Sequence, residues 1–169
     1  MSDDSAPVTI SERRESNLPI PEPTLAAVQP LVGETGRVNF PDVCGRVVHG
    51  DQRGRTLGFP TANLELDEWS AGIPCDEVLA DGVWAGRCVL RDGRSIPAAI
   101  SIGRRRTFYG GDGPRLLEAH LIDFAEDLYG EEIRVHLDLW IRAQTTFATK
   151  EDLVDALESD VRYARVHVK

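Results

Sequence analysis

The stretch IRVHLDLWI, residues 133–141, gives the clearest strand signal in the chain. Its odd positions carry aliphatic side chains: Ile133, Val135, Leu137, Leu139 and Ile141. The positions between them carry Arg134, His136, Asp138 and Trp140. Successive side chains of a strand point to opposite faces, so this alternation predicts a half-buried antiparallel strand with its aliphatic face in the core.

Further β-prone runs precede this strand, at residues 43–49, 83–90, 96–102 and 116–124. The pair Asp92-Gly93 separates two of them and is a strong hairpin signal. Residues 50–54 look like a turn, and residues 65–82, which contain glycine, proline and several acids, look like a connecting loop.

A helix is expected after the last strand. Thr149 is placed to cap it, with Asp152 at the capping-box position, and an apolar stripe follows at Leu153, Leu157, Val161 and Ala164. Short strands followed by one terminal helix favour a mainly β fold over a doubly wound α/β sheet. We expect a six-stranded antiparallel Greek-key-like β-barrel with a C-terminal α-helix.

Length and composition limit the organisation of the chain. The 169 residues suffice for one well-buried domain. Residues 1–40 hold five prolines and little apolar periodicity, so we expect a flexible N-terminal tail followed by a folded domain over 41–169. Neither a long apolar run nor a secretory signal pattern is present, which predicts a cytoplasmic protein with no membrane contact.

Charge and residue usage exclude several classes of site. A net charge of -9 argues against broad nucleic-acid binding. Cys44, Cys75 and Cys88 are widely spaced, which favours buried thiols over a disulfide framework or a zinc site. Lys150 and Lys169 are the only lysines, which excludes a P-loop, a kinase strand lysine and a plausible Schiff base. Phosphate chemistry would have to use arginine, backbone amides and a metal.

The segment GRTLGFPTAN, residues 54–63, combines loop-forming glycines, an arginine and a fixed proline with two small oxygen-bearing side chains. In an extended run Thr61 and Asn63 point to the same side, where their oxygens could hold one Mg²⁺. The same residue types are also ordinary turn formers. Composition alone leaves these two interpretations equally open.

Glu118 lies in LLEAHLIDF, residues 116–124, among apolar neighbours that could tune a carboxylate for proton transfer. The alternative is an outward-facing residue on an alternating strand, which the spacing alone favours. His120 lies on the same face, where it could orient Glu118 or fill a polar pocket; the pocket role is the favoured one.

Several segments, taken in order, resemble the riboflavin kinase family. They are GRVVHGDQRGRTLGFPTANL at 45–64, DGVWAG at 81–86, AAISIG at 98–103, LEAHLIDFAEDLYGEEIRV at 117–135 and IRAQTTFATKEDL at 141–153. The resemblance covers about residues 43–165 and implies a barrel with a terminal helix. It also implies transfer of the ATP γ-phosphate to riboflavin, giving FMN and ADP; protein partners stay unknown.

The resemblance assigns roles position by position. It implies that Glu118 is the catalytic base and that Thr61 and Asn63 contact Mg²⁺ and the ATP phosphates. Further nucleotide contacts are implied at Gly50, Arg55, Leu121, Asp123 and Tyr129. Flavin contacts are implied at Arg142, Thr145 and Phe147.

Two segments depart from the family pattern. Arg106 occupies a position where the family has proline, and Ala143-Gln144-Thr145-Thr146 lacks the family's usual acid and lysine. An upstream adenylyltransferase domain, common in bacterial members, is not expected in the short tail, so FAD synthesis is not expected either. The alternatives are a non-catalytic flavin- or nucleotide-binding regulatory module of this fold and, least favoured, a structural barrel for protein contacts.

Overall fold

The computed structural model describes residues 42–66, 69–70, 73–74, 81–106 and 112–169. Its strands are β1 (Val43–Val48), β2 (Ala62–Leu66), β3 (Trp69–Ser70), β4 (Ile73–Pro74), β5 (Gly82–Val89), β6 (Ser95–Arg106), β7 (Asp112–Leu121) and β8 (Glu132–Arg142). Its helices are α1 (Arg53–Thr56) and α3 (Lys150–His167). The expected flexible tail and Cys75 lie outside the described residues. Of the other two cysteines expected to be buried, Cys88 is buried, but Cys44 is exposed, so that expectation is wrong for Cys44.

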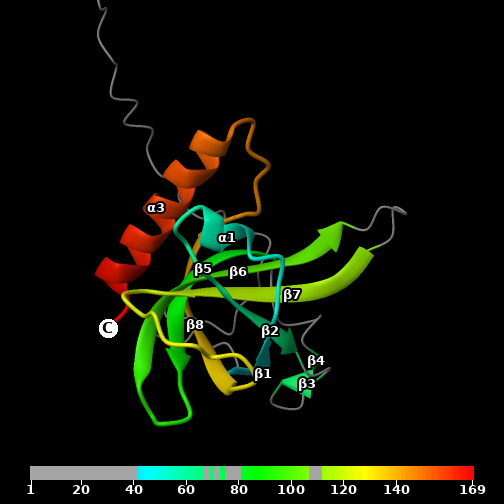
Figure 1. The fold of residues 1–169 in the computed structure, drawn as a ribbon, viewed down its shortest axis with the longest axis vertical. Helices are drawn as coiled ribbons and strands as arrows, with labels where there is room; N and C mark the ends of the chain where they lie inside the picture. Colours follow the sequence, from blue (N-terminus) through cyan, green and yellow to red (C-terminus); the bar gives the residue numbers. More distant parts are fainter. Residues whose placement is uncertain (1–41, 67–68, 71–72, 75–80, 107–111) are drawn as a thin grey trace, which may run out of the picture.

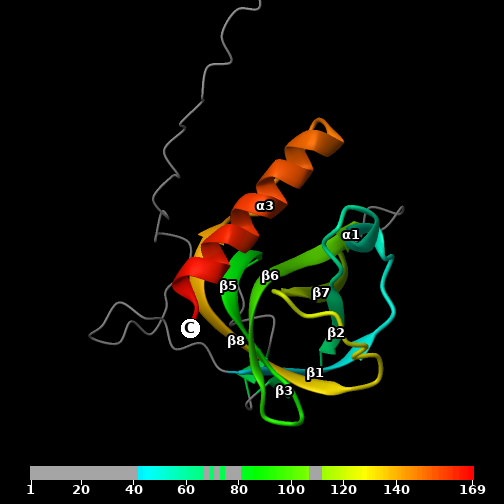
Figure 2. The ribbon, with the colours of Figure 1, turned by 60° about the vertical axis from the view of Figure 1, so that its left-hand side comes forward.

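The main sheet is a closed barrel in the order β1-β2-β7-β6-β5-β8, and every neighbouring pair is antiparallel. The predicted six-stranded antiparallel barrel with a C-terminal helix is therefore confirmed. Figures 1 and 2 show α3 lying along one side of the barrel and α1 at the rim. The interior is filled by one apolar cluster that includes Leu64, Trp84, Ile100, Leu117 and Val135.

The alternation predicted for residues 133–141 holds for only part of β8. Ile133, Val135 and Leu137 are buried in the barrel interior, but Leu139 and Ile141 pack with the cluster beneath α3. The cause is a register shift, because β5 residues Ala85 and Gly86 pair with Leu139 and Leu137, leaving one residue of β8 extra. A bulge of this kind reverses which face the following side chains take.

Trp140 is the main consequence of that reversal. The alternation places it with the polar residues, yet it packs against the interior cluster and meets Trp84 edge to face, with 4.8 Å between ring centroids. Gly82 makes room for it, since a Cβ at that position would overlap the Trp140 ring. The placement of Trp140 inferred from the strand pattern is thus wrong.

Helix α3 begins as expected, because the Thr149 hydroxyl accepts a hydrogen bond from the Asp152 N–H at 3.0 Å. Ala164 and Val168 are buried against Ala85 of β5 and Ile122. Other element bounds differ from the sequence expectation. The expected loop at 65–82 contains the end of β2 and the short β3–β4 ribbon, and the expected turn at 50–54 runs into α1.

Candidate functional site

Three polar residues form a row across the outer face of the barrel. Asn63 of β2 pairs with Glu118 of β7, and Glu118 pairs in turn with Ser101 of β6. Directly opposite residues on neighbouring strands have Cβ atoms about 5 Å apart, so these side chains are within reach of one another. Their chain neighbours Leu64 and Leu117 are buried inside the barrel, which directs the row outward.

The row faces a cavity of about 380 Å³ that we call the helix-side cavity. Segments from four parts of the chain line it: the region around α1, the outer strand face, residues 142–147 and the inner side of α3. The side chains that line it include Thr61, Asn63, Ser101, Glu118, Arg142, Gln144, Thr145, Phe147 and Asp160. Glu118 does point away from the barrel interior, as the alternative interpretation held. It is only partly exposed, because it lies within the walls of this cavity.

A second cavity of about 400 Å³ lies on the other side of Thr61, and we call it the loop-side cavity. Its wall includes Arg55, Pro60 and the loop that follows β7, with Phe124, Glu126 and Tyr129. Thr61 lines both cavities. The two spaces therefore meet at the residue that begins the Thr-Ala-Asn sequence.

The predicted site residues divide between the two cavities. Arg55, Leu121 and Tyr129, predicted to contact the nucleotide, line the loop-side cavity. Arg142, Thr145 and Phe147, predicted to contact the flavin, line the helix-side cavity together with Glu118 and Asn63. Two predicted nucleotide residues line neither cavity: Gly50 and Asp123.

Asp123 and Gly50, which line neither cavity, contact other parts of the structure. The Asp123 carboxylate accepts a hydrogen bond from the Arg165 guanidinium of α3 at 2.9 Å. Gly50 lies against the Asn63 side chain so closely that a Cβ would overlap the amide group. Gly50 therefore acts on the site by allowing Asn63 its position.

Asn63 has the environment expected of a metal ligand. The residue is 7% exposed, and its Nδ2 donates to the Thr61 carbonyl oxygen at 3.3 Å. Its Oδ1 is buried and has no hydrogen-bond partner among the described residues. Leaving a buried acceptor unpaired costs about 1–3 kcal/mol, and an oxygen-seeking cation would satisfy it. The unpaired oxygen of Asn63 thus fits a magnesium ion at this position, next to Thr61.

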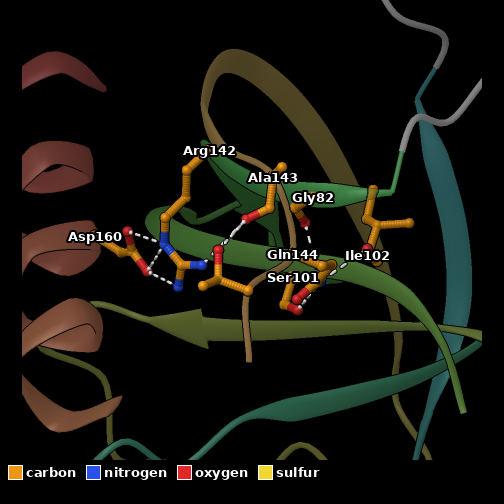
Figure 3. Close-up of polar contacts among 8 residues, drawn as sticks. Gly82, Ser101, Ile102, Arg142, Ala143, Gln144 and Asp160 are labelled. Atoms are coloured by element: carbon orange, nitrogen blue, oxygen red, sulfur yellow. Dashed lines mark hydrogen bonds and ion pairs between the residues drawn. The ribbon is translucent and has the colours of Figure 1, made fainter. Parts of the chain in front are cut away.

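Arg142 is held by α3. Its Nε donates to both carboxylate oxygens of Asp160, at 3.1 and 3.2 Å, and its Nη2 donates to Oδ2 at 2.7 Å, as Figure 3 shows. Its guanidinium also lies 5.5 Å from the centre of the Phe147 ring. Burial raises the pKa of the Asp160 carboxyl, and the Arg142 contact opposes that rise. Arg142 therefore fixes the wall of the cavity, with Asp160 occupying much of its donor capacity.

Gln144 anchors the same segment to the barrel. Its Nε2 donates to the Ser101 hydroxyl at 2.9 Å and to the Ile102 carbonyl oxygen at 3.0 Å (Figure 3). Sequence reasoning missed both Gln144 and Asp160 as site residues. Asp160 had a usable signal, because it interrupts the apolar face of α3 between Leu157 and Ala164. Gln144 had none, since its partners lie more than forty residues away.

A family model, curated relatives and solved structures are similar to this chain. The family model described as "Riboflavin kinase" matches residues 39–168. The bifunctional riboflavin kinase/FMN adenylyltransferase of Escherichia coli is 36% identical over 141 residues, covering 83% of this chain and 41% of that protein. A riboflavin kinase structure from Trypanosoma brucei superposes with a TM-score of 0.53 at 29% identity, covering 73% of this chain and 76% of that one.

A further solved structure, titled as a macrolide-efflux protein from Streptococcus pneumoniae, gives a TM-score of 0.63 at 35% identity. It covers 73% of this chain and 38% of that chain. The chain spans about two fifths of the length of the curated relatives it matches, 37% and 41% for two of them. Neither helix of the described residues is both long enough and apolar enough to cross a membrane.

Proposed function

The chain belongs to the riboflavin kinase family, and from this premise we propose that it transfers the γ-phosphate of ATP to the 5'-hydroxyl of riboflavin. The products are FMN and ADP. We assign ATP to the loop-side cavity and riboflavin to the helix-side cavity. The cytoplasmic location stays a prediction from the sequence.

One observation carries the proposal: two cavities of similar size meet at Thr61, and Glu118 lies beside that junction through its pairing with Asn63. A phosphoryl transfer between two bound substrates needs donor and acceptor in line, with a proton acceptor at the hydroxyl. A simple binding module has no use for a carboxylate at such a junction. The arrangement therefore favours catalysis over binding alone.

The chemistry then follows from the residues at the junction. Glu118 accepts the proton of the riboflavin hydroxyl as that oxygen attacks the γ-phosphorus, and the bond from the γ-phosphorus to the bridging oxygen of ADP breaks. Arg55 lines the wall of the loop-side cavity, and in this proposal its guanidinium binds phosphate oxygens. Positioning supplies most of the rate in such transfers, so a modest base suffices.

A magnesium ion bound at the Asn63 and Thr61 oxygens would supply neutralisation of phosphate charge. The described residues contain no group of three or more His, Cys, Asp or Glu arranged for a metal. A magnesium ion does not need such a group, because it keeps several waters and takes further ligands from the substrate phosphates.

The test is incubation of the purified protein with riboflavin, ATP and Mg²⁺, followed by chromatographic separation of FMN from riboflavin. We expect FMN and ADP to appear in equal amounts and to require the divalent ion. Flavin binding without FMN formation would replace this proposal with the regulatory module. Absence of both would refute the assignment of the helix-side cavity to riboflavin.

A further inference from the structure

The loop between β7 and β8 forms one wall of the loop-side cavity, through Phe124, Glu126 and Tyr129. Its backbone is tied near each end. The Ile122 N–H donates to the Pro97 carbonyl oxygen at 2.8 Å, and the Gly130 N–H donates to the Val47 carbonyl oxygen at 2.9 Å. The central part, which faces the cavity, is held by side chains.

Arg94, at the tip of the β5–β6 hairpin, makes that central attachment. Its Nη1 and Nη2 donate to the two carboxylate oxygens of Glu126 at 2.6 and 2.8 Å. Its Nε donates to Asp92 at 2.6 Å, and its guanidinium lies 5.7 Å from the centre of the Phe124 ring. One side chain thus contacts two residues that line the cavity. A two-pronged contact of this kind fixes orientation as well as distance.

The charges around this cavity give Arg94 a second effect. The wall carries one cationic side chain, Arg55, and two acidic ones, Glu126 and Asp127, among the described lining residues. An ATP molecule brings several negative charges, so an uncompensated carboxylate on the wall would repel it. The Arg94 guanidinium pairs with both Glu126 and Asp92, so it offsets part of their negative charge, and its hydrogen bonds lower the pKa of the Glu126 carboxyl.

We propose that Arg94 is a positioning residue for the nucleotide: it holds the β7–β8 loop against the hairpin and offsets part of the charge of Glu126 at the cavity wall. The inference rests on the proposed function, since it takes ATP as the occupant of this cavity. Arg94 acts through Glu126 and Phe124, and it lines neither cavity itself. Its loss should therefore affect the nucleotide and spare the flavin.

The test is to measure KM for ATP and for riboflavin separately in Arg94→Ala. We expect KM for ATP to rise about two- to fivefold, the range that exposed ion pairs usually give. KM for riboflavin should stay unchanged. Because Arg94 and Glu126 are 46% and 60% exposed, the rise in KM for ATP should shrink as ionic strength increases. Equal rises in both KM values, or no rise, would overturn the proposal.

A double-mutant cycle identifies the partner. When Glu126 is first changed to Gln, the added change Arg94→Ala should alter KM for ATP much less than it does in the wild type. An equal effect in both backgrounds would show that Arg94 does not act through Glu126. Arg87→Ala is the matched control, because Arg87 makes a similar two-pronged contact with Asp138 at 3.0 and 3.1 Å and lines neither cavity.

Calorimetric titration with ADP separates this inference from the proposed function. Should the wild type bind ADP but form no FMN, the proposed function fails while the Arg94 effect can still be measured as a two- to fivefold loss of ADP affinity. Wild-type turnover with equal ADP affinity in Arg94→Ala would overturn the Arg94 inference alone.

Discussion

At the scale of single residues, Thr61 lies between the loop-side and helix-side cavities, and the side chains near it offer different chemical groups. Asn63 offers a buried amide oxygen, while Glu118 offers a carboxylate on the adjacent strand. The two are far apart in the chain, and only the β2–β7 register brings them together. Local sequence patterns could identify Asn63 and Glu118 as candidate site residues, but they could not show that the two are neighbours.

Replacing Glu118 by Gln keeps the side-chain shape and removes the proton acceptor. We expect kcat to fall about 100- to 10,000-fold, the usual contribution of general base catalysis, with riboflavin affinity retained. Stopped-flow turnover and equilibrium flavin binding measure the two quantities. Glu65→Gln is the control, because Glu65 lies two residues beyond Asn63 on β2, is exposed and lines neither cavity. Unchanged kcat in Glu118→Gln would remove Glu118 from the base role.

Gly50→Ala tests how Asn63 is held. The added methyl group would overlap the Asn63 amide, so the amide must move and its Oδ1 leaves the proposed metal position. We expect the Mg²⁺ concentration needed for half-maximal turnover to rise, together with a loss of stability. In the double variant Gly50→Ala, Asn63→Ala the overlap is gone, so stability should recover while activity does not. Recovery of activity as well would argue against Asn63 as a metal ligand.

At the scale of elements, the strands and the terminal helix could be predicted, but their irregularities could not. The Thr149 cap was a local signal and is confirmed, while of the predicted apolar stripe Val161 and Ala164 pack with the cluster beneath α3 and Leu153 and Leu157 line the helix-side cavity. The register shift in β8 depends on how β5 pairs with it, which no pattern within residues 133–141 records. Trp140 was therefore placed on the wrong face.

Helix α3 contributes to the site through one buried ion pair. The Asp160 side chain is 4% exposed and that of Arg142 is 23% exposed. Asp160→Asn leaves a largely buried guanidinium without its counter-charge, so we expect the free energy of unfolding to fall by about 1–3 kcal/mol. KM for riboflavin should rise because residues 143–147 lose one anchor. Urea denaturation and steady-state kinetics provide the two measurements.

The control for that variant is Asp123→Asn. Asp123 also pairs with α3, through Arg165 at 2.9 Å, but the two side chains are 72% and 55% exposed. Breaking this exposed pair should change the free energy of unfolding by less than about 0.5 kcal/mol. Equal losses in the two variants would show that burial of Asp160 is not what makes its ion pair important.

At the scale of the whole molecule, barrel closure creates the site. The short strands and single helix favoured a mainly β fold from sequence alone, and the ordered family segments agreed with it. The cavities could not be foreseen in the same way, because they arise where the outer faces of β2, β7 and β6 meet α1, α3 and the β7–β8 loop. Residues such as Gln144 and Arg94 gain their partners only after closure.

The buried thiol of Cys88 in the barrel interior leads to a prediction about the stability of the whole fold. Cys88 is 0% exposed, and burial raises the pKa of its thiol to about 12. An unfolded chain loses this proton near pH 8.5, so the thiol stabilises the fold below that pH, and its contribution is lost as the pH rises toward 12.

Relative to Cys88→Ala, the wild type should lose about 1.4 kcal/mol of unfolding free energy per pH unit above pH 9. Urea denaturation under reducing conditions at several alkaline pH values measures this loss, and Cys44→Ala, which changes an exposed thiol, should follow the wild type. Parallel curves for wild type and Cys88→Ala would show that the interior admits water around Cys88, contrary to a closed barrel core.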